Sequence, residues 1–149
     1  MNYYEKLRWS RAMNSPRLLD RHPLDNGLTL EFWDHSRPLV GDRCYVNLEA
    51  RIAIPVRAEK LPAELQAHAA LVAEALGEEI IFSRSEARNF IAASEALALL
   101  RDMQDRMVAL APGYFGHADF AAGFIRKKFA EKQALRQGQR LDTRRSDDA

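Results

Sequence analysis

The chain has a single cysteine, Cys44, among its 149 residues. One thiol excludes an intrachain disulfide and a zinc site built from clustered cysteines. Cys44 falls on the apolar side of a predicted strand, where a thiol normally behaves as a small buried hydrophobe. The four histidines are dispersed, and no two have the spacing of helical metal ligands. We therefore predict neither a metal site nor any other cofactor.

Long hydrophobic runs are also absent. No apolar stretch approaches the roughly 20 residues that a membrane-spanning helix needs, and the N-terminal MNYYEKLRWSR lacks the apolar core of a signal peptide. The composition, 47% hydrophobic and 29% charged, is typical of a folded globular protein. We therefore expect a cytoplasmic protein with one α+β domain over residues 1–137 and a basic, frayed or disordered tail over residues 138–149.

The motifs that most directly identify an enzyme are missing as well. The chain has no GxxxxGK[ST], no GxGxxG after a strand, no HExxH and no GxSxG. These absences remove the common routes to assigning a reaction, so the sequence leaves open whether the protein is an enzyme.

Charge is present but unevenly distributed. Residues 25–125 carry a net charge of −6, whereas residues 126–145 hold eight basic residues against two acidic ones. Five of the basic residues recur every four positions: Lys128, Lys132, Arg136, Arg140 and Arg144. In a helix each step of four drifts by about 40°, so the five form a slanting stripe. The stripe is either a solvated surface, weakened by Gly138, or a contact for an anionic partner.

Clean period-two alternation predicts a long antiparallel β-hairpin over residues 28–56. The apolar positions that alternate along its two strands are even-numbered, and the set is Leu28, Leu30, Phe32, Cys44, Val46, Leu48, Ala50, Ile52, Ile54 and Val56. We expect this face to be buried. Pairing Ser36 with Asp42 leaves a five-residue loop and sets Trp33 opposite Tyr45, and aromatic pairs of this kind stabilise a sheet. This register is therefore the predicted one.

The rest of the chain is predicted to be mainly helical. Pro62 and Gly77 bracket one helix, whose apolar stripe includes His68, and a short strand follows near residues 79–82. The sequence SRSE, beginning at Ser83, matches a capping box, so a core helix containing Phe90 is expected to run from there to about residue 111. A last helix should begin near Asp119. A further helix is predicted over residues 3–13.

Polar and aromatic residues gather at the corner of the hairpin. The candidate ligand corner consists of Trp33, Asp34, His35, Ser36, Arg37, Arg43 and Tyr45. Successive strand residues point to opposite faces, so Asp34 and His35 cannot pair with each other. Asp and Ser beside a turn commonly bond backbone groups. We therefore assign no catalytic residue, and expect Asp34 and Ser36 to hold the turn.

Part of this region resembles a known family. RLLDR at residues 17–21, followed by DHS at residues 34–36 before a strand, is similar to the RxxxR and [DN]xSxxG signatures of PilZ domains. The resemblance implies a cyclic di-GMP site in which the arginines and the Asp/Ser pair hold the nucleotide. It covers at most residues 17–56, and Leu39 stands where the pattern has glycine. The helical second half also differs from the six-stranded barrel that this family implies.

The predicted fold class is α+β. A small antiparallel sheet, built on the hairpin over residues 28–56 and a short strand near 79–82, is packed by three to four α-helices. The predicted function is that of a binding or adaptor module whose basic C-terminal helix contacts an anionic partner, with nucleic acid as the first candidate and an acidic protein surface as the second. The alternative is a small enzyme or nucleotide-sensing domain that uses residues 33–45.

Overall fold

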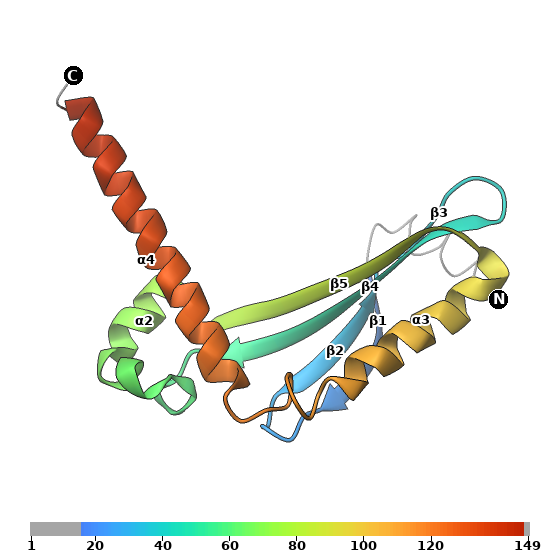
Figure 1. Cartoon of the computed structure of the whole chain (residues 1–149), viewed down its shortest axis with the longest axis horizontal. Coiled ribbons are helices and arrows are strands. Elements are labelled where there is room, and N and C mark those ends of the chain that lie inside the picture. Colours follow the sequence, from blue (N-terminus) through green and yellow to red (C-terminus); the bar gives the residue numbers. More distant parts are fainter. Residues whose placement is uncertain (1–15, 148–149) are drawn as a thin grey trace. The chain divides into compact units, whose positions relative to one another are not determined.

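A computed structural model describes residues 16–147 of the chain, and the side chains of residues 16–140. Within this range the fold is mixed α+β, with an antiparallel sheet of five strands and three α-helices (Figure 1). The predicted fold class is confirmed at this level. The helix expected over residues 3–13 lies outside the described residues.

The chain divides into two compact units, each with its own buried residues. The first unit contains residues 1–52 and 81–117, and the second contains residues 53–80 and 118–149.

The strands are β1 (Arg17–Pro23), β2 (Thr29–Asp34), β3 (Arg37–Pro38), β4 (Arg43–Pro55) and β5 (Glu79–Ala92). In the first unit β2 pairs antiparallel with β1 and with β4, and β3 pairs with the beginning of β4. β5 also pairs with β4. The thirteen residues of β4 are therefore the shared partner of three other strands.

The even-numbered face of the hairpin is buried, as the alternation predicts. Leu30, Phe32, Val46, Leu48 and Ile52 are all 0% exposed in the first unit, and Ile54 is equally buried in the second. Cys44 lies on the same face and is also fully buried. Burial raises the pKa of its thiol, and the carboxylates of Asp42 and Asp34 add to this effect. Cys44 is therefore an inert core residue.

The register of the hairpin differs from the predicted one. Trp33 lies opposite Glu49, four residues further along β4 than expected, while Glu31 lies opposite Arg51 and Arg37 opposite Tyr45. Opposite charges now face each other, and the Arg37 guanidinium lies 5.1 Å from the centre of the Tyr45 ring. These cross-strand contacts replace the single aromatic pair on which the prediction rested.

The turn explains how this register is reached. Residues 37 and 38, which were expected to lie in a five-residue loop, form β3 instead. The Leu39 N–H donates to the Arg43 carbonyl at 2.8 Å, and the Arg43 N–H donates to the Val40 carbonyl at 3.1 Å. Gly41 has a φ of 61°, which glycine adopts without the steric penalty of a side chain. The tight turn therefore sits two residues later than predicted.

The helix expected from Ser83 is wrong in its first part. Residues 83–92 continue β5, and helix α3 (Ala93–Ala109) begins only after them. A capping box contributes about 1 kcal/mol, whereas pairing with β4 satisfies a backbone donor or acceptor at successive residues. Phe90, predicted to be in the core, is 58% exposed with a φ of 59°.

Helix α3 lies along β1 and β2 in the first unit (Figure 1). Its first N–H, at Ala93, donates to the Asp42 carbonyl at 2.7 Å, and the Gln104 amide donates to the Asp20 carboxylate on β1 at 2.9 Å. Its buried side consists of Ala96, Leu100, Met103 and Met107. These four residues have the i, i+4, i+7 spacing that covers one face of a helix.

The second unit contains the end of β4, the beginning of β5, two short 3-10 helices, and the helices α2 and α4. The 3-10 segments are η1 (Ala58–Lys60) and η2 (Ala63–His68), and α2 is Ala69–Leu76. The helix predicted between Pro62 and Gly77 is therefore present, with a 3-10 first half. Gly77, with a φ of 83°, ends it, and its N–H donates to the Ala73 carbonyl at 2.7 Å. His68, expected within the apolar stripe, is exposed.

Helix α4 (Phe120–Asp147) begins directly after Asp119, as predicted. Phe120, Ile125 and Phe129 are buried and fix its N-terminal half within the second unit. Figure 1 shows α4 passing alongside α2 and then continuing as a single helix. Its backbone is helical through Gly138, while the expected fraying of residues 138–149 stays a prediction.

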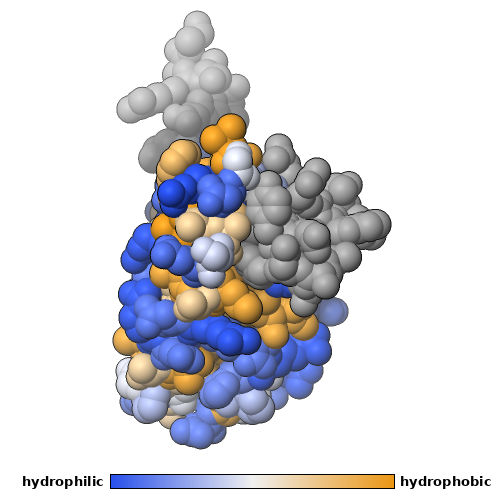
Figure 2. Space-filling view, turned by 90° about the vertical axis from the view of Figure 1, so that its right-hand side faces the viewer, coloured by the Kyte–Doolittle hydropathy of each residue, from blue (hydrophilic) through white to orange (hydrophobic). Residues whose placement is uncertain are grey.

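Two surface properties complete the description. No described helix combines the length and apolar character needed to cross a membrane. On the face of the molecule in Figure 2, hydrophobic and hydrophilic residues are interspersed.

The buried hairpin face predicts a large cost for removing one of its side chains. Leu48→Ala deletes a fully buried side chain from β4, so we expect the free energy of unfolding to fall by about 2–5 kcal/mol. Urea denaturation measures this loss. Val40→Ala, at a turn position that is 70% exposed, serves as the control and should change stability little. A negligible loss for Leu48→Ala would contradict the buried face.

Candidate functional site

The basic residues of α4 divide into those paired within the protein and those that are not. The Arg126 Nε donates to the Glu64 carboxylate on η2. The Lys128 ammonium lies 3.3 Å from Glu131 and 5.4 Å from the centre of the Phe124 ring. Lys132, Arg136 and Arg140 are exposed and make no ion pair with the described residues. Apart from Lys127, which is also exposed, the unpaired charges therefore lie from Lys132 onward.

Helical geometry places these cations on one slanting stripe. With a rise of 1.5 Å and a rotation of 100° per residue, Lys128 and Arg140 are about 18 Å apart along the axis and about 120° apart around it. No acidic residue occurs between Lys132 and Arg140. The backbone of Arg144 continues the stripe, and its side chain lies beyond the described range. We define residues 128, 132, 136, 140 and 144 as the basic stripe.

Arg126 is electrostatically separate from the basic stripe. Its hydrogen bond holds the pKa of Glu64 below the usual value for a glutamate, and Glu64 in turn raises the pKa of Arg126. Both groups are therefore ionised at neutral pH and neutralise each other. The basic residues of the helix that make no ion pair with the described residues are Lys127, Lys132, Arg136 and Arg140.

The hairpin corner is split between the two faces of the sheet. Asp34 and Ser36 are buried, and the Ser36 N–H donates to the Asp34 carboxylate at 2.9 Å. The Ser36 Oγ accepts from the Asn47 N–H at 3.0 Å, and the Arg17 guanidinium lies 3.4 Å from Asp34. Asp34 and Ser36 therefore bond the backbone beside the turn, and His35 lies on the other face.

The outer face holds a polar cluster around Glu49. The Glu49 carboxylate lies 2.7 Å from the His35 Nε2, 2.9 Å from the Arg51 Nε and 2.5 Å from the Ser83 Oγ. The Arg51 guanidinium also lies 4.9 Å from the centre of the Trp33 ring. Partial burial raises the pKa of Glu49, but the hydrogen bonds from Ser83, Arg51 and His35 outweigh it, so the net pKa is lowered.

This cluster lacks the arrangement needed for nucleophilic catalysis. A serine nucleophile needs a base, usually an imidazole, that accepts its proton, and an acid that orients the base. Here the carboxylate lies between the other two groups, and the Ser83 hydroxyl donates to Glu49 rather than to His35. The described residues also contain no group of three or more His, Cys, Asp or Glu side chains that could hold a metal. The geometry favours a structural ion-pair network.

The remaining corner residues are also separated. Arg37 and Tyr45 form the cation–π pair across β3 and β4. The Arg43 guanidinium lies 5.7 Å from the centre of the Phe90 ring and 3.8 Å from Asp42. The seven predicted corner residues are therefore distributed over both faces of the sheet and the turn.

The residues behind the PilZ resemblance make internal contacts. Arg17 pairs with Asp34, whose side chain is 1% exposed, and Arg21 pairs with Glu31 at 2.9 Å. The Asp and Ser that would hold a nucleotide thus lie on the buried face. These contacts do not favour the nucleotide-sensing hypothesis, which stays untested.

Comparison with known proteins adds no assignment. No family model matches the chain, and neither the curated proteins nor the solved structures give a match. The functional argument therefore depends on the geometry of the described residues.

Sequence reasoning did not identify the Glu49 cluster. Glu49 has the same strand parity as Trp33, His35 and Arg51, and this is the signal that places it on the outer face. Ser83 was assigned to a helix cap, so its place on β5 beside Glu49 could not be anticipated.

The contacts of the hairpin corner predict opposite outcomes for two neighbouring residues. Asp34→Ala leaves the Ser36 N–H without its acceptor in a buried site, so we expect a loss of about 1–3 kcal/mol in the free energy of unfolding. His35→Gln changes a partly exposed side chain and should cost less than about 1 kcal/mol. Urea denaturation of both variants decides the point, and an equal or larger loss for His35→Gln would contradict it.

The lowered pKa of Glu49 predicts a pH-dependent contribution to stability. A carboxyl group with a lower pKa in the folded than in the unfolded state stabilises the fold above its unfolded pKa, and this contribution is lost as the pH falls through the folded pKa. We expect Glu49→Gln to be destabilising at pH 7, and the difference from wild type to shrink below pH 4.5, the ordinary value for this group. Thermal unfolding of the variant and of wild type between about pH 3 and pH 7, which covers the range where carboxylates titrate, measures this difference. Glu79→Gln, at an exposed position of β5, is the control.

Proposed function

We propose that the protein is a nucleic-acid-binding module and that the basic stripe of α4 is its contact surface. The observation that supports this is the row of exposed cations, Lys132, Arg136 and Arg140, on a helix whose opposite end is anchored by buried Ile125 and Phe129. The anchor keeps the helix attached while leaving its C-terminal half accessible to a partner.

The spacing of the stripe suits a polyanion. Successive cations are about 6 Å apart along the helix axis, and duplex DNA presents one phosphate charge per about 3.4 Å on each strand. The stripe, about 24 Å long from residue 128 to residue 144, therefore meets several phosphates at once. Because such contacts read the backbone and not the bases, the expected binding is independent of sequence.

The composition of the stripe favours a polyanion over an acidic protein surface. Protein interfaces usually have apolar or aromatic residues at their centre. Between Glu131 and Arg140 the only large hydrophobic side chain is Leu135, which is 63% exposed. Leu135 is one residue from Arg136 and therefore about 100° away from it around the helix. A contact made by the stripe is consequently almost purely electrostatic.

The proposal predicts a steep salt dependence. Neutralising about five phosphates gives a slope of log affinity against log salt of roughly −4 to −5 on duplex DNA. Fluorescence anisotropy with a labelled duplex, measured from low salt upward, determines this slope. Replacing all five stripe residues by Gln should remove the binding without unfolding the protein, because exposed charges contribute little to the core.

A charge-preserving variant is the matched control. In it, each lysine of the stripe becomes arginine and each arginine becomes lysine, so affinity and slope should be retained. A shallow slope, or unchanged binding after the five Gln substitutions, would contradict the proposal. Circular dichroism establishes that α4 remains helical in each variant.

A further inference from the structure

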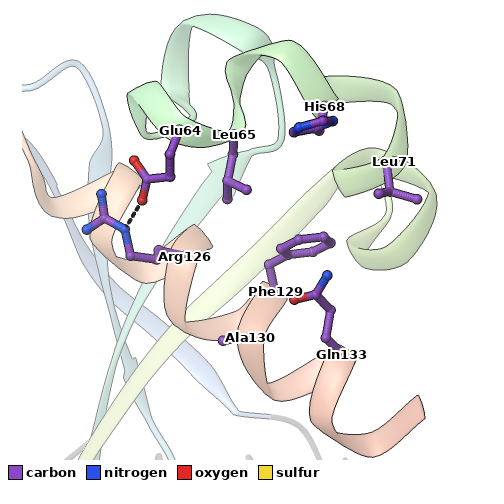
Figure 3. Close-up of a pocket in the computed structure, with 8 residues that line it drawn as sticks. All are labelled: Glu64, Leu65, His68, Leu71, Arg126, Phe129, Ala130 and Gln133. Carbon is purple, nitrogen blue, oxygen red and sulfur yellow. Dashed lines mark hydrogen bonds and ion pairs between the residues drawn. The ribbon is translucent and has the colours of Figure 1, made fainter. Parts of the chain in front are cut away.

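A cavity lies within the second unit, between α4 and the segment η2–α2. Its volume is about 380 Å³, within the range of about 300–1,000 Å³ that is common for small-molecule sites. Figure 3 shows Leu65 and Phe129 pointing toward each other across its middle and Leu71 at one end. Leu71 is 48% exposed, and the lining at this end also includes the polar side chains of His68 and Gln133. The middle of the site therefore suits an apolar group.

One end of the cavity is charged. The ion pair between Glu64 and Arg126 lies at this end, as the dashed line in Figure 3 marks. Glu64 accepts from the Nε of Arg126, and a guanidinium has five N–H donors in all. The terminal Nη groups make no hydrogen bond with the described residues. The Nη groups of Arg126 can therefore bind a second carboxylate while its Nε stays hydrogen-bonded to Glu64.

Beyond the cavity, the exposed part of α4 is positively charged. At the end away from Arg126 the lining residue on α4 is Gln133, and from there to Arg140 the helix carries two cations and no acid. The carboxylate of Glu64 is already neutralised by Arg126. An ammonium ligand would have to compete with Arg126 for Glu64, the one acidic residue that lines the cavity.

We infer that this cavity binds a small amphipathic carboxylate. The carboxylate lies on the Nη groups of Arg126, and the apolar tail runs over Leu65 and Phe129 toward Leu71. From Arg126 to Gln133 the cavity follows α4 for about 10 Å, which corresponds to a tail of medium length. The lining residues include no member of the basic stripe, so the cavity and the stripe can be tested with separate variants.

Decanoate is the probe, titrated below its micelle-forming concentration and followed by isothermal titration calorimetry. We expect saturable binding at one site, tighter than that of decanol or decyltrimethylammonium. Ala130→Phe inserts a ring into the cavity from an exposed position and should abolish binding. Ala134→Phe adds the same ring one turn later, outside the lining residues, and should leave the Kd within about twofold because it alters no contact of the ligand.

Two substitutions at the charged end of the cavity should change the affinity for decanoate in opposite directions. Arg126→Gln removes the cation and should weaken decanoate binding about tenfold. Glu64→Gln removes the competing carboxylate and should strengthen it about threefold. Both replacements are at exposed positions, and circular dichroism checks that they leave the fold unchanged.

The inference is overturned if decanoate does not bind, if Ala130→Phe and Ala134→Phe have equal effects, or if decyltrimethylammonium binds more tightly than decanoate. A weaker Kd for Glu64→Gln would also overturn it. None of these outcomes bears on duplex binding by the basic stripe, which the anisotropy titration measures separately.

Discussion

Backbone pairing along β4 is the constraint on which the sheet depends. This strand is hydrogen-bonded to β2 and β3 on one edge and also pairs with β5. Because its side chains alternate strictly, the pairing buries one face from Cys44 to Ile54 and leaves the other for Tyr45, Glu49 and Arg51. The observed register then brings Glu49 to His35 and Arg51 to Trp33. The polar cluster on the outer face is thus a consequence of how β4 is paired.

The sequence predicted the features that depend on local periodicity. The buried face of the hairpin, the opposite facing of Asp34 and His35 and the start of α4 at Asp119 all follow from side-chain spacing or from a single capping residue. The features that failed depend on tertiary pairing. Ser83–Glu86 carries a helix-capping signal, yet β4 recruits it as a strand, and the turn at Gly41 shifts the hairpin register by four residues along β4. Neither outcome is visible in a window of local sequence.

The candidate sites also divide into those that local sequence predicts and those that depend on tertiary packing. The basic stripe could be located from the sequence because it needs only a four-residue repeat on one helix. The cavity could not, because Leu65 and Leu71 meet Phe129 only when η2–α2 packs on α4 (Figure 3). The prediction that the seven residues of the hairpin corner form one ligand site is not supported, because they share a stretch of sequence but not a face of the sheet. In this protein, proximity in sequence located a candidate site only where one helix carried all of its residues.

The central claim is that α4 presents a surface for nucleic acid, and mapping of the contact tests it most directly. In a two-dimensional NMR titration of the ¹⁵N-labelled chain with a short DNA duplex, the backbone amides of Lys132, Arg136 and Arg140 should shift progressively. Those of Trp33, His35 and Glu49 on the outer face of the sheet should stay in place. Shifts centred on the sheet, or no shifts at low salt, would contradict the account.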